Sequence, residues 1–340
     1  MLGSFTISEL SAHALSPDVS NQSGAALTMT TFAFVFPGQG SQAVAMLDAW
    51  GDHPAVRDTL QEASQALGED IGVLIATGPK EQLDLTTNTQ PVMLTAAIAC
   101  WRAWLAEGGA QPVAVAGHSL GEYSALVAAG ALSLADALPL VRLRAQAMQQ
   151  AVPVGAGAMA AILGLDSAAV AEGCAQAAAA TGEVVSAANF NDPKQTVISG
   201  SKAGVDKACE LLKAMGAKRT LLLAVSAPFH CALMKPAAEA LRERLLSVPL
   251  QSPLMPVINN IDVAAPTDAE AIRDALYRQA FGPVRWVEVV LALRARGATH
   301  IVECGPGKVL AGMVKRIDAE LNSGAIFDPA SLQDVKGMLA

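Results

Sequence analysis

A serine stands between two glycines in the run Gly117-His118-Ser119-Leu120-Gly121, which has the G-x-S-x-G spacing of a nucleophile elbow. The apolar run before it predicts a strand, and the residues after it predict a helix. Glycines at these two positions permit a tight turn that lifts the serine hydroxyl clear of its neighbours. We therefore predict that Ser119 is a nucleophile. The alternative is an ordinary glycine-rich turn in which the serine caps a helix.

A serine nucleophile needs a base, and the chain has five histidines. His13 lies in an N-terminal segment without clear periodicity, His53 in a surface-like turn, and His300 at the start of a strand far from any nucleophile signature. His118 precedes the serine, and side-chain alternation at a strand end predicts that it points away. His230 remains as the candidate base, although elimination alone leaves a structural role equally open.

Five motifs, taken in order along the chain, resemble the malonyl-CoA:acyl-carrier-protein transacylase family. This family includes the acyltransferase domains of fatty-acid and polyketide synthases. The similarity runs from about residue 31 to the C-terminus. The motifs are Phe36-Pro37-Gly38-Gln39-Gly40-Ser41-Gln42, Gly117-His118-Ser119-Leu120-Gly121-Glu122, Val141-Arg142-Leu143-Arg144, Pro228-Phe229-His230 and Gly305-Pro306-Gly307-Lys308-Val309-Leu310.

The resemblance implies a set of catalytic residues. Ser119 matches the family nucleophile and His230 the base, without a buried carboxylate. Gln279 matches the residue whose backbone carbonyl orients the imidazole in place of the usual Asp, although its side chain could equally lie on the surface. The backbone N–H groups of Gln39 and Leu120 match the oxyanion hole, and the positive end of the following helix favours negative charge there.

The resemblance also implies residues that bind substrate. Arg144 matches the arginine that holds the malonyl carboxylate by bidentate pairing, although its motif alone favours a solvated helix face. Phe229 replaces a Ser of some close relatives, and its bulk favours malonyl over methylmalonyl. Asn189 and Asn191 resemble residues at the acyl and thiol-arm entrance, or are turn formers. Gln90 is near the pocket in relatives, or is a polar helix start.

The implied reaction has two steps. The serine takes the malonyl group from malonyl-CoA, and the phosphopantetheine thiol of acyl carrier protein then accepts it, in fatty-acid or polyketide synthesis. No metal or redox cofactor is expected. The enzymatic alternative is a serine thioesterase or hydrolase, marked by an Asp or Glu partner between serine and histidine. The non-enzymatic alternative is a carrier-protein-binding scaffold that has lost catalysis.

Carrier proteins of this type are acidic, so an acidic enzyme needs a local basic patch to bind one. Solvated surface is the ordinary role of exposed lysines. The candidates, by location in the sequence only, are Lys194, Lys202, Lys207, Lys213, Lys218 and Lys308.

The elements that position these residues alternate between strand-like and helix-like stretches, which favours a parallel sheet covered by helices. We predict an α/β fold with a large α/β-hydrolase-like core. The run Gly305-Pro306-Gly307 lacks Walker spacing and is assigned to the pocket wall. The expected elements are strands at 31–36, 112–116 and 300–303, helices at 91–107, from about 119 and at 236–246, and an extended segment at 255–260.

Residues 156–226 have a different order, β-α-β-β-α-β, which is that of a ferredoxin-like unit. We predict that this small subdomain is inserted into the large catalytic subdomain, which comprises 31–155 and 227–340. Its expected strands are 159–163, 184–189, 195–200 and 219–225, with a turn at 191–193, and its helices are 167–180 and 202–215.

Composition agrees with a globular enzyme. Of 340 residues, 52% are hydrophobic and 16% charged, which is far from the signature of disorder. The net charge of -8 argues against nucleic-acid binding. The apolar runs are too short to span a bilayer, so no membrane association is expected. Five scattered cysteines predict reduced thiols in a cytoplasmic protein, which we expect to be a monomer.

Residues 1–30 are rich in Ser, Ala, Thr and Asn, and they contain no Lys or Arg, so they lack the positive region of a secretory signal. We interpret them as an N-terminal extension that is disordered unless it docks, or that remains from expression of the protein, with Met29 as a natural start.

Overall fold

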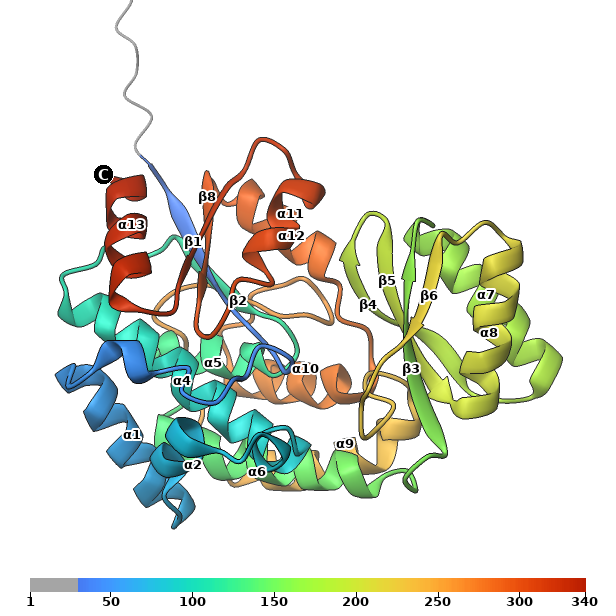
Figure 1. Ribbon diagram of the computed structural model, residues 1–340, viewed down its shortest axis with the longest axis horizontal. Helices are drawn as coiled ribbons and strands as arrows, with labels where there is room; N and C mark the ends of the chain where they lie inside the picture. The colour runs from blue at the N-terminus through green and yellow to red at the C-terminus, as the bar shows by residue number, and fades with distance from the viewer. Residues whose placement is uncertain (1–29) are drawn as a thin grey trace, which may run out of the picture.

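The structure is a computed structural model that describes residues 30–340. His13, and all of the predicted extension except Thr30, lie outside the described residues. The described part contains a large body and a smaller lobe, each built on its own sheet (Figure 1).

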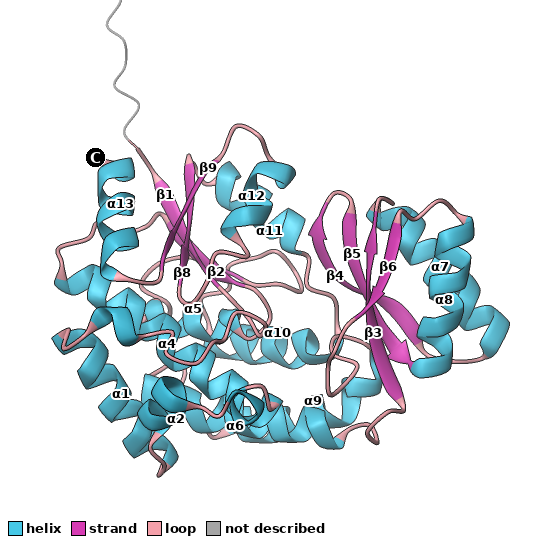
Figure 2. Ribbon diagram, in the orientation of Figure 1, coloured by secondary structure: helices cyan, strands magenta, loops and turns pink. Residues whose placement is uncertain are grey.

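The large sheet has five parallel strands, and its order places the first strand at the centre. The order is β7 (Val257–Ile258), β2 (Ala114–Gly117), β1 (Phe32–Phe36), β8 (His300–Cys304) and β9 (Asn322–Ile326). Every residue of β1 is buried, because helices cover both faces of the sheet (Figure 2). This arrangement confirms the predicted α/β class.

Side chains of β1 alternate between two cores. Phe32, Phe34 and Phe36 belong to the larger core, whereas Ala33 and Val35 belong to the second core on the opposite face. The larger core is formed with helices that include α1 (Pro54–Leu67), α2 (Ile71–Thr77), α4 (Thr86–Ala106), α5 (Gly121–Ala128), α6 (Leu134–Gln150), α9 (Lys235–Leu246), α10 (Ala269–Phe281) and α13 (Pro329–Leu339). The second core is formed with α11 (Trp286–Ala295) and α12 (Ala311–Ile317). Short helical segments complete the body, namely η1 (Asp48–Trp50), α3 (Lys80–Leu83) and η2 (Ala232–Met234).

The smaller lobe is a four-stranded antiparallel sheet with the order β4-β5-β3-β6, and two helices pack on one face of it. Along the chain its elements follow the order β-α-β-β-α-β. They are β3 (Gly157–Leu163), α7 (Ser167–Thr181), β4 (Val185–Asp192), β5 (Gln195–Ser201), α8 (Lys202–Ala214) and β6 (Arg219–Leu222). The division of the chain into subdomains at residues 156 and 226 stays a prediction.

The bounds of some elements differ from the sequence-based expectation. Helix α4 begins at Thr86 instead of Pro91, because the Leu85 carbonyl accepts the Asn88 and Thr89 amides and so completes a turn before the proline. Strand β4 continues through the predicted turn to Asp192, since β5 pairs with it that far. Strand β6 ends three residues early, and the extended segment at 255–260 contains only the two-residue β7.

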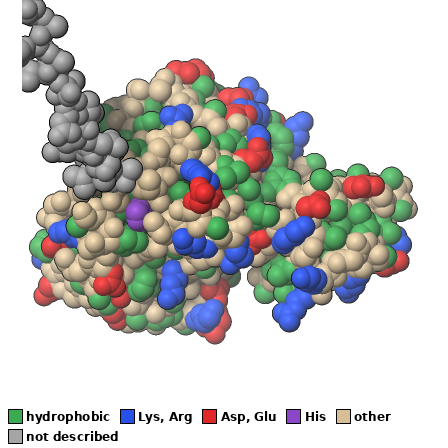
Figure 3. Space-filling view, turned by 90° about the horizontal axis from the view of Figure 1, so that it is seen from above, with side chains coloured by type: hydrophobic (Ala, Val, Ile, Leu, Met, Phe, Trp, Pro, Cys, Tyr) green, Lys and Arg blue, Asp and Glu red, His purple; other side chains and the backbone are tan. Residues whose placement is uncertain are grey.

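Hydrogen bonds join the smaller lobe to the body. The Phe190 amide donates to the Val284 carbonyl at 2.9 Å, and the Val284 amide donates to the Ala188 carbonyl at 2.8 Å. Arg316 of α12 donates from Nε to Asp192 Oδ2 at 2.7 Å. The space-filling view shows the narrowing between body and lobe, with Lys and Arg side chains on both (Figure 3).

None of the helices within residues 30–340 combines the length and the apolar character that crossing a membrane requires.

Candidate active site

The predicted elbow joins β2 to α5, which begins at Gly121, close to the expected start near Ser119. Ser119 has φ +52°, a left-handed conformation that is uncommon for a residue with a side chain. The flanking glycines are required by close contact. A Cβ on Gly117 would lie 1.8 Å from the Gly121 carbonyl oxygen, and one on Gly121 would lie 2.1 Å from the Phe36 carbonyl oxygen. The backbone of the elbow therefore packs directly against the backbone at the end of β1, with no space for a side chain between them.

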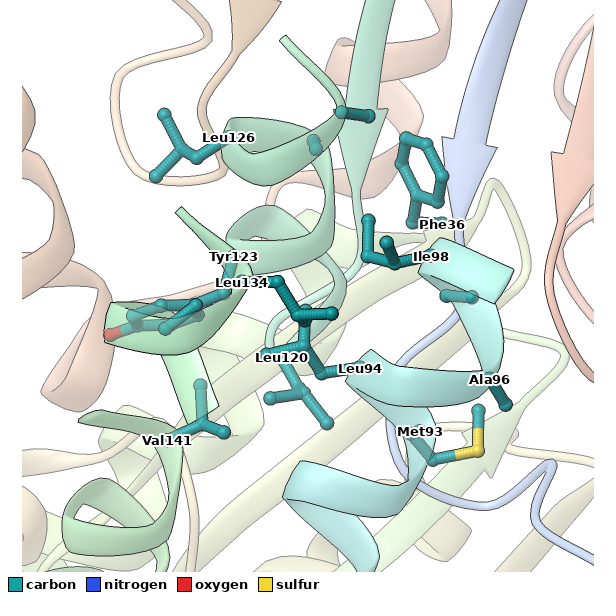
Figure 4. Packing of buried hydrophobic residues seen from close by; sticks show 14 of the residues in the cluster. Phe36, Met93, Leu94, Ala96, Ile98, Leu120, Tyr123, Leu126, Leu134 and Val141 are labelled. Carbon is teal, nitrogen blue, oxygen red and sulfur yellow. The ribbon is translucent and has the colours of Figure 1, made fainter. Parts of the chain in front are cut away.

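The side chain of Leu120 anchors the elbow from behind. It is 1% exposed and points into the larger core, beside Leu94 of α4 and Leu134 of α6 (Figure 4). Burying a leucine side chain stabilises its position by about 1.5–3 kcal/mol. The hydrophobic core thus fixes the residue whose backbone amide lies next to Ser119.

The structure brings Ser119 and His230 together across 111 residues of sequence, with Oγ 2.6 Å from Nε2. Nδ1 of the imidazole lies 3.0 Å from the carbonyl oxygen of Gln279 and 3.1 Å from that of Gly282. Because carbonyl oxygens only accept, Nδ1 carries the proton and Nε2 is free to accept the serine proton. His230, like Ser119, has a positive φ, +60°. No sequence pattern could have identified the Gly282 carbonyl as a partner of His230, because every residue has a backbone carbonyl.

His230 is held in its neutral form. Burial lowers the pKa of its imidazole to about 3, and the positive charge of Arg144 and the neighbouring His118 act in the same direction. A histidine that is unprotonated at neutral pH is able to act as a general base.

Arg144, on α6, reaches the same hydroxyl. Its Nη2 lies 3.2 Å from Ser119 Oγ and 3.2 Å from Gln279 Oε1, and its Nη1 lies 2.9 Å from Gln90 Oε1. Arg144 is 3% exposed, so the interpretation that it lies on a solvated helix face is wrong. Arg142, by contrast, forms an ion pair near the surface with Glu69.

The guanidinium of Arg144 has no carboxylate within ion-pair distance among residues 30–340, and its buried Nε has no hydrogen-bond partner there. The Tyr123 ring, 5.6 Å away, lies beneath it. Buried charges are normally paired, so this arrangement is suited to a ligand carboxylate.

Two glutamines support the arginine, and both of their alternative interpretations are wrong. Gln279 is fully buried, so it is not a surface residue. Its Nε2 donates to the Ser119 carbonyl at 2.9 Å and to Glu122 Oε2 at 3.1 Å. Gln90 lies inside α4 at 2% exposed, so it is not a polar helix start. Both side chains use their amide oxygens to accept from Arg144.

The two amides predicted for the oxyanion hole lie at one cavity. Gln39 follows β1, Leu120 precedes α5, and both residues line the cavity beside Ser119. Neither amide donates a hydrogen bond to any residue between 30 and 340. The amides are thus free to meet a ligand oxygen, and the oxyanion role stays a prediction.

The cavity has a volume of about 500 Å³, within the range of small-molecule sites. The body and the smaller lobe both contribute to its wall. The body supplies Gln39, Gln90, His118, Ser119, Leu120, Arg144, Phe229 and His230, among others, and the lobe and the segment after it supply Met159, Asn189, Leu223, Ala224 and Val225.

Some predicted residues lie elsewhere than expected. His118 lines the cavity, and its Nε2 lies 2.9 Å from Asn191 Oδ1; its predicted orientation away from Ser119 stays a prediction. Asn189 and Asn191 lie in β4 at 7% exposed, so they are not turn formers, and only Asn189 lines the cavity. No residue of the Gly305–Gly307 run lines the cavity. The run packs behind the Gln39 loop instead, with Gly305 against Pro37.

Two lysines of the predicted basic patch form ion pairs with acidic residues of the same helix. Lys202 donates to Asp206 at 2.8 Å and Lys207 to Glu210 at 3.1 Å, each within one helix. The other lysines named for the patch are exposed, and none of them lines the cavity. Lys80, which the sequence did not single out, does line it.

Sequence reasoning missed two residues at the elbow. Asn260 follows β7, and its side chain bonds to the peptide groups on both sides of His118. Glu122 follows the elbow and accepts from the Asn260 backbone amide at 2.8 Å. Burial raises the pKa of the Glu122 carboxyl to about 7. Glu122 stands in the quoted elbow motif, whereas Asn260 has no local signal beyond an Asn-Asn pair after a short strand.

Comparison with known proteins identifies a family. Residues 33–325 match the Acyl transferase domain family. A relative from Salmonella typhimurium, the malonyl CoA-acyl carrier protein transacylase, is 52% identical over 89% of this chain and 98% of its own length.

Two solved structures are also similar to the chain. An acyl-carrier-protein S-malonyltransferase from Burkholderia pseudomallei is 64% identical with a TM-score of 0.88, covering 90% of this chain and 99% of that one. A malonyl-transacylase solved in complex with its type II PKS acyl-carrier protein is 49% identical with a TM-score of 0.87, covering 89% and 98%.

Proposed function

The chain belongs to the acyl transferase domain family, and on that premise we propose that it transfers the malonyl group of malonyl-CoA to the phosphopantetheine thiol of acyl carrier protein. The transfer passes through a malonyl ester on Ser119. It serves the assembly of acyl chains in fatty-acid or polyketide synthesis.

One observation carries the choice of acyl group. The buried guanidinium of Arg144 lies 3.2 Å from the Ser119 hydroxyl and has no carboxylate partner among the described residues. An acyl group that ends in a carboxylate brings the missing negative charge, and bidentate pairing holds it in one orientation. An acetyl group leaves the guanidinium unpaired, so the site favours malonyl.

In the first step, Ser119 Oγ attacks the thioester carbonyl carbon while His230 Nε2 takes the hydroxyl proton. The carbonyl oxygens of Gln279 and Gly282 stabilise the imidazolium that forms, in the place of a carboxylate. The amides of Gln39 and Leu120 bind the oxygen that becomes negative. The carbon–sulfur bond then breaks, and the imidazolium protonates the leaving thiolate.

In the second step, the carrier-protein thiol gives its proton to His230 and its sulfur attacks the ester carbon. The bond to Ser119 Oγ breaks, and His230 returns the proton to the serine. No electron is gained or lost and no water is consumed, so nucleophile, base and oxyanion donors suffice without a metal or redox cofactor. Phe229, in the cavity wall, narrows the space beside the substrate and favours malonyl over methylmalonyl.

The test is incubation with malonyl-CoA, followed by intact-mass and peptide analysis. One malonyl ester is expected, located on Ser119, and Ser119→Ala should prevent it. Ser124→Ala is the matched control, because Ser124 is a buried serine of α5 whose hydroxyl has no hydrogen-bond partner among residues 30–340. A malonyl group on another residue, or unchanged transfer by Ser119→Ala, contradicts the proposal.

The hydrolase alternative has a different requirement. It needs an Asp or Glu partner for the histidine, but two backbone carbonyls occupy Nδ1 of His230. The distinguishing measurement is release of free malonate in the absence of a thiol acceptor. Release as fast as transfer to carrier protein would identify a thioesterase, and release much slower than transfer supports the transferase.

A further inference from the structure

We propose that Asn260 is a positioning residue, whose side-chain amide locks the Ser119 elbow in the conformation that attacks. The inference rests on the proposed function only in taking Ser119 as the nucleophile. Asn260 lies after β7, 141 residues from the serine in sequence, and is fully buried.

The two ends of the Asn260 amide bridge the elbow. Its Oδ1 accepts from the Ser119 backbone N–H at 2.7 Å, and its Nδ2 donates to the Gly117 carbonyl at 2.7 Å. One planar group therefore fixes the peptide units on both sides of His118. An ionised Asp has no donor and a Leu has neither a donor nor an acceptor, so neither supplies both bonds.

The clamp itself is held from the opposite side. The Asn260 backbone N–H donates to Glu122 Oε2 at 2.8 Å, and its carbonyl accepts from the Arg285 amide at 3.2 Å. Glu122 Oε2 also accepts from Gln279 Nε2 at 3.1 Å, and Gln279 contacts Arg144 and His230. The clamp thus belongs to the same network that holds the base and the cation.

The elbow needs such a clamp because its conformation is unfavourable by itself. A residue with a side chain at a left-handed φ costs on the order of 1–3 kcal/mol and persists only where its surroundings determine it. The bond to Asn260 also occupies the Ser119 N–H. The next amide, that of Leu120, is then the one left free toward the cavity.

This role makes a specific prediction about reactivity. The clamp acts on the serine and does not touch the cavity, since Asn260 is absent from its lining. Loss of the clamp should therefore slow every reagent that modifies Ser119 Oγ by a similar factor. A malonyl thioester depends on Arg144, whereas a small neutral organofluorophosphate does not, so the two reagents together separate positioning from substrate binding.

The experiment compares Asn260→Asp with Asn259→Asp. The first change removes the donor to Gly117 at almost unchanged volume when the new carboxyl is ionised, so the rates are measured at the alkaline end of the range in which the protein stays folded. The second is the matched control one residue earlier: Asn259 is 3% exposed, and its side-chain oxygen, which Asp keeps, accepts from the Asp262 amide at 2.8 Å. Both add a carboxyl in the neighbourhood of Glu122, because Asn259 and Glu122 line one small cavity.

In Asn260→Asp, the rate constants for Ser119 malonylation and for phosphorylation should both fall by about 10- to 100-fold, because misplaced nucleophiles lose that much. The dissociation constant of malonyl-CoA, measured with Ser119→Ala present, should differ by no more than about twofold with and without Asn260→Asp. A twofold change is well below the tenfold change that corresponds to about 1.4 kcal/mol. Asn259→Asp should leave both rates unchanged.

The proposal is overturned if both rates in Asn260→Asp stay near the original values. It is also overturned if only malonylation becomes slower, since that result would assign Asn260 to substrate binding. If the variant does not fold, amide hydrogen exchange in the unaltered protein decides. The Ser119 amide should then exchange as slowly as amides of β1, and exchange as fast as a solvent-exposed loop amide overturns the clamp. Failure of the unaltered protein to accept malonyl would count against the proposed function alone, since the organofluorophosphate still reports on the elbow.

Discussion

At the scale of single residues, one hydroxyl is contacted by a neutral base and by a buried cation. Ser119 Oγ lies 2.6 Å from His230 Nε2 and 3.2 Å from Arg144 Nη2. The cation lowers the pKa of the base and also stabilises negative charge on the serine oxygen. The arginine therefore affects both the reactivity of the serine and the choice of acyl group, and experiments have to separate these two effects.

Changing Arg144 to Ala should alter selectivity more than folding. Malonylation should fall about 10- to 100-fold relative to acetylation, because a charge-assisted hydrogen bond contributes roughly 1.5–3 kcal/mol. The measurement is the ratio of the two acylation rates from malonyl-CoA and acetyl-CoA. Arg142→Ala, on the same helix but paired with Glu69, is the control and should keep the original ratio. An equal loss for both acyl groups would make Arg144 structural.

The pH dependence of malonylation should lack an ordinary histidine titration. The pKa of His230 is lowered from 6.5 to about 3, so the base stays unprotonated and contributes no change of rate between about pH 5 and 8. The group of this network that titrates in that range is Glu122, whose pKa is raised to about 7 by burial. Arg144→Ala removes one cause of the lowering, so its acid limb should move to higher pH. Rapid-quench rates across this range test both statements, and an acid limb near 6.5 that remains in Glu122→Gln contradicts them.

The same shift has a consequence for stability. A lowered histidine pKa means that the unfolded chain binds a proton that the folded chain does not bind. This contribution to the free energy of unfolding is therefore complete above pH 6.5, and it decreases as pH falls from 6.5 toward 3.

At the scale of elements, the elbow depends on how closely β2, α5 and β1 approach one another. The glycines before and after the serine leave no space for a Cβ, and the Leu120 side chain in the core holds the turn from behind. The loop of Gln39 meets the elbow at the end of β1, the neighbouring strand of β2. Two adjacent strand ends thus carry the two amides predicted to bind the oxyanion.

Gly117→Ala should disrupt this element. Its Cβ would lie 1.8 Å from the Gly121 carbonyl oxygen, so the backbone has to move, at a cost of about 1–3 kcal/mol. Urea unfolding should show the destabilisation, and malonylation of the folded fraction should fall sharply. Gly312→Ala in α12 is the control, because a Cβ there meets nothing within 4 Å, and stability should be unchanged or slightly higher. Full activity in Gly117→Ala would show that the elbow tolerates the shift.

At the scale of the whole molecule, the cavity lies between two sheets of different construction. The parallel sheet supplies the nucleophile at a strand end, and the antiparallel sheet supplies part of the opposite wall. Their relative position is held by backbone hydrogen bonds at Val284 and by the Arg316–Asp192 pair, in which the Asp192 carboxylate is nearly buried.

Arg316→Ala should weaken the attachment of the lobe. It leaves the buried Asp192 carboxylate without its charged partner, which costs about 1–3 kcal/mol. The expected result is a lower free energy of unfolding in urea together with a higher KM for carrier protein. Arg57→Ala, which removes an exposed pair with Asp58, should change stability by less than about 0.5 kcal/mol. Equal effects of the two substitutions would contradict a role for Arg316 in holding the lobe.

The sequence by itself determined whatever depends on local pattern. Backbone propensity and side-chain periodicity act over short distances, so neighbouring residues are enough to predict a local element. They predicted the strand–turn–helix around Ser119, the alternation that defines the α/β class, and the β-α-β-β-α-β order of the smaller lobe. The resemblance of five motifs added the family and Arg144 as a candidate, and it supported His230, which elimination among the histidines had already left as the candidate base.

The tertiary structure alone decided how the remaining groups are used. Burial placed Arg144 inside the molecule, where it has no carboxylate partner among residues 30–340, and it placed Gln279 in the network instead of on the surface. The Gly282 carbonyl and the Asn260 clamp are supplied from elements 52 and 141 residues away from their partners. Such contacts have no sequence pattern, because backbone carbonyls are common to all residues and a side-chain amide shows its partners only when the chain has folded.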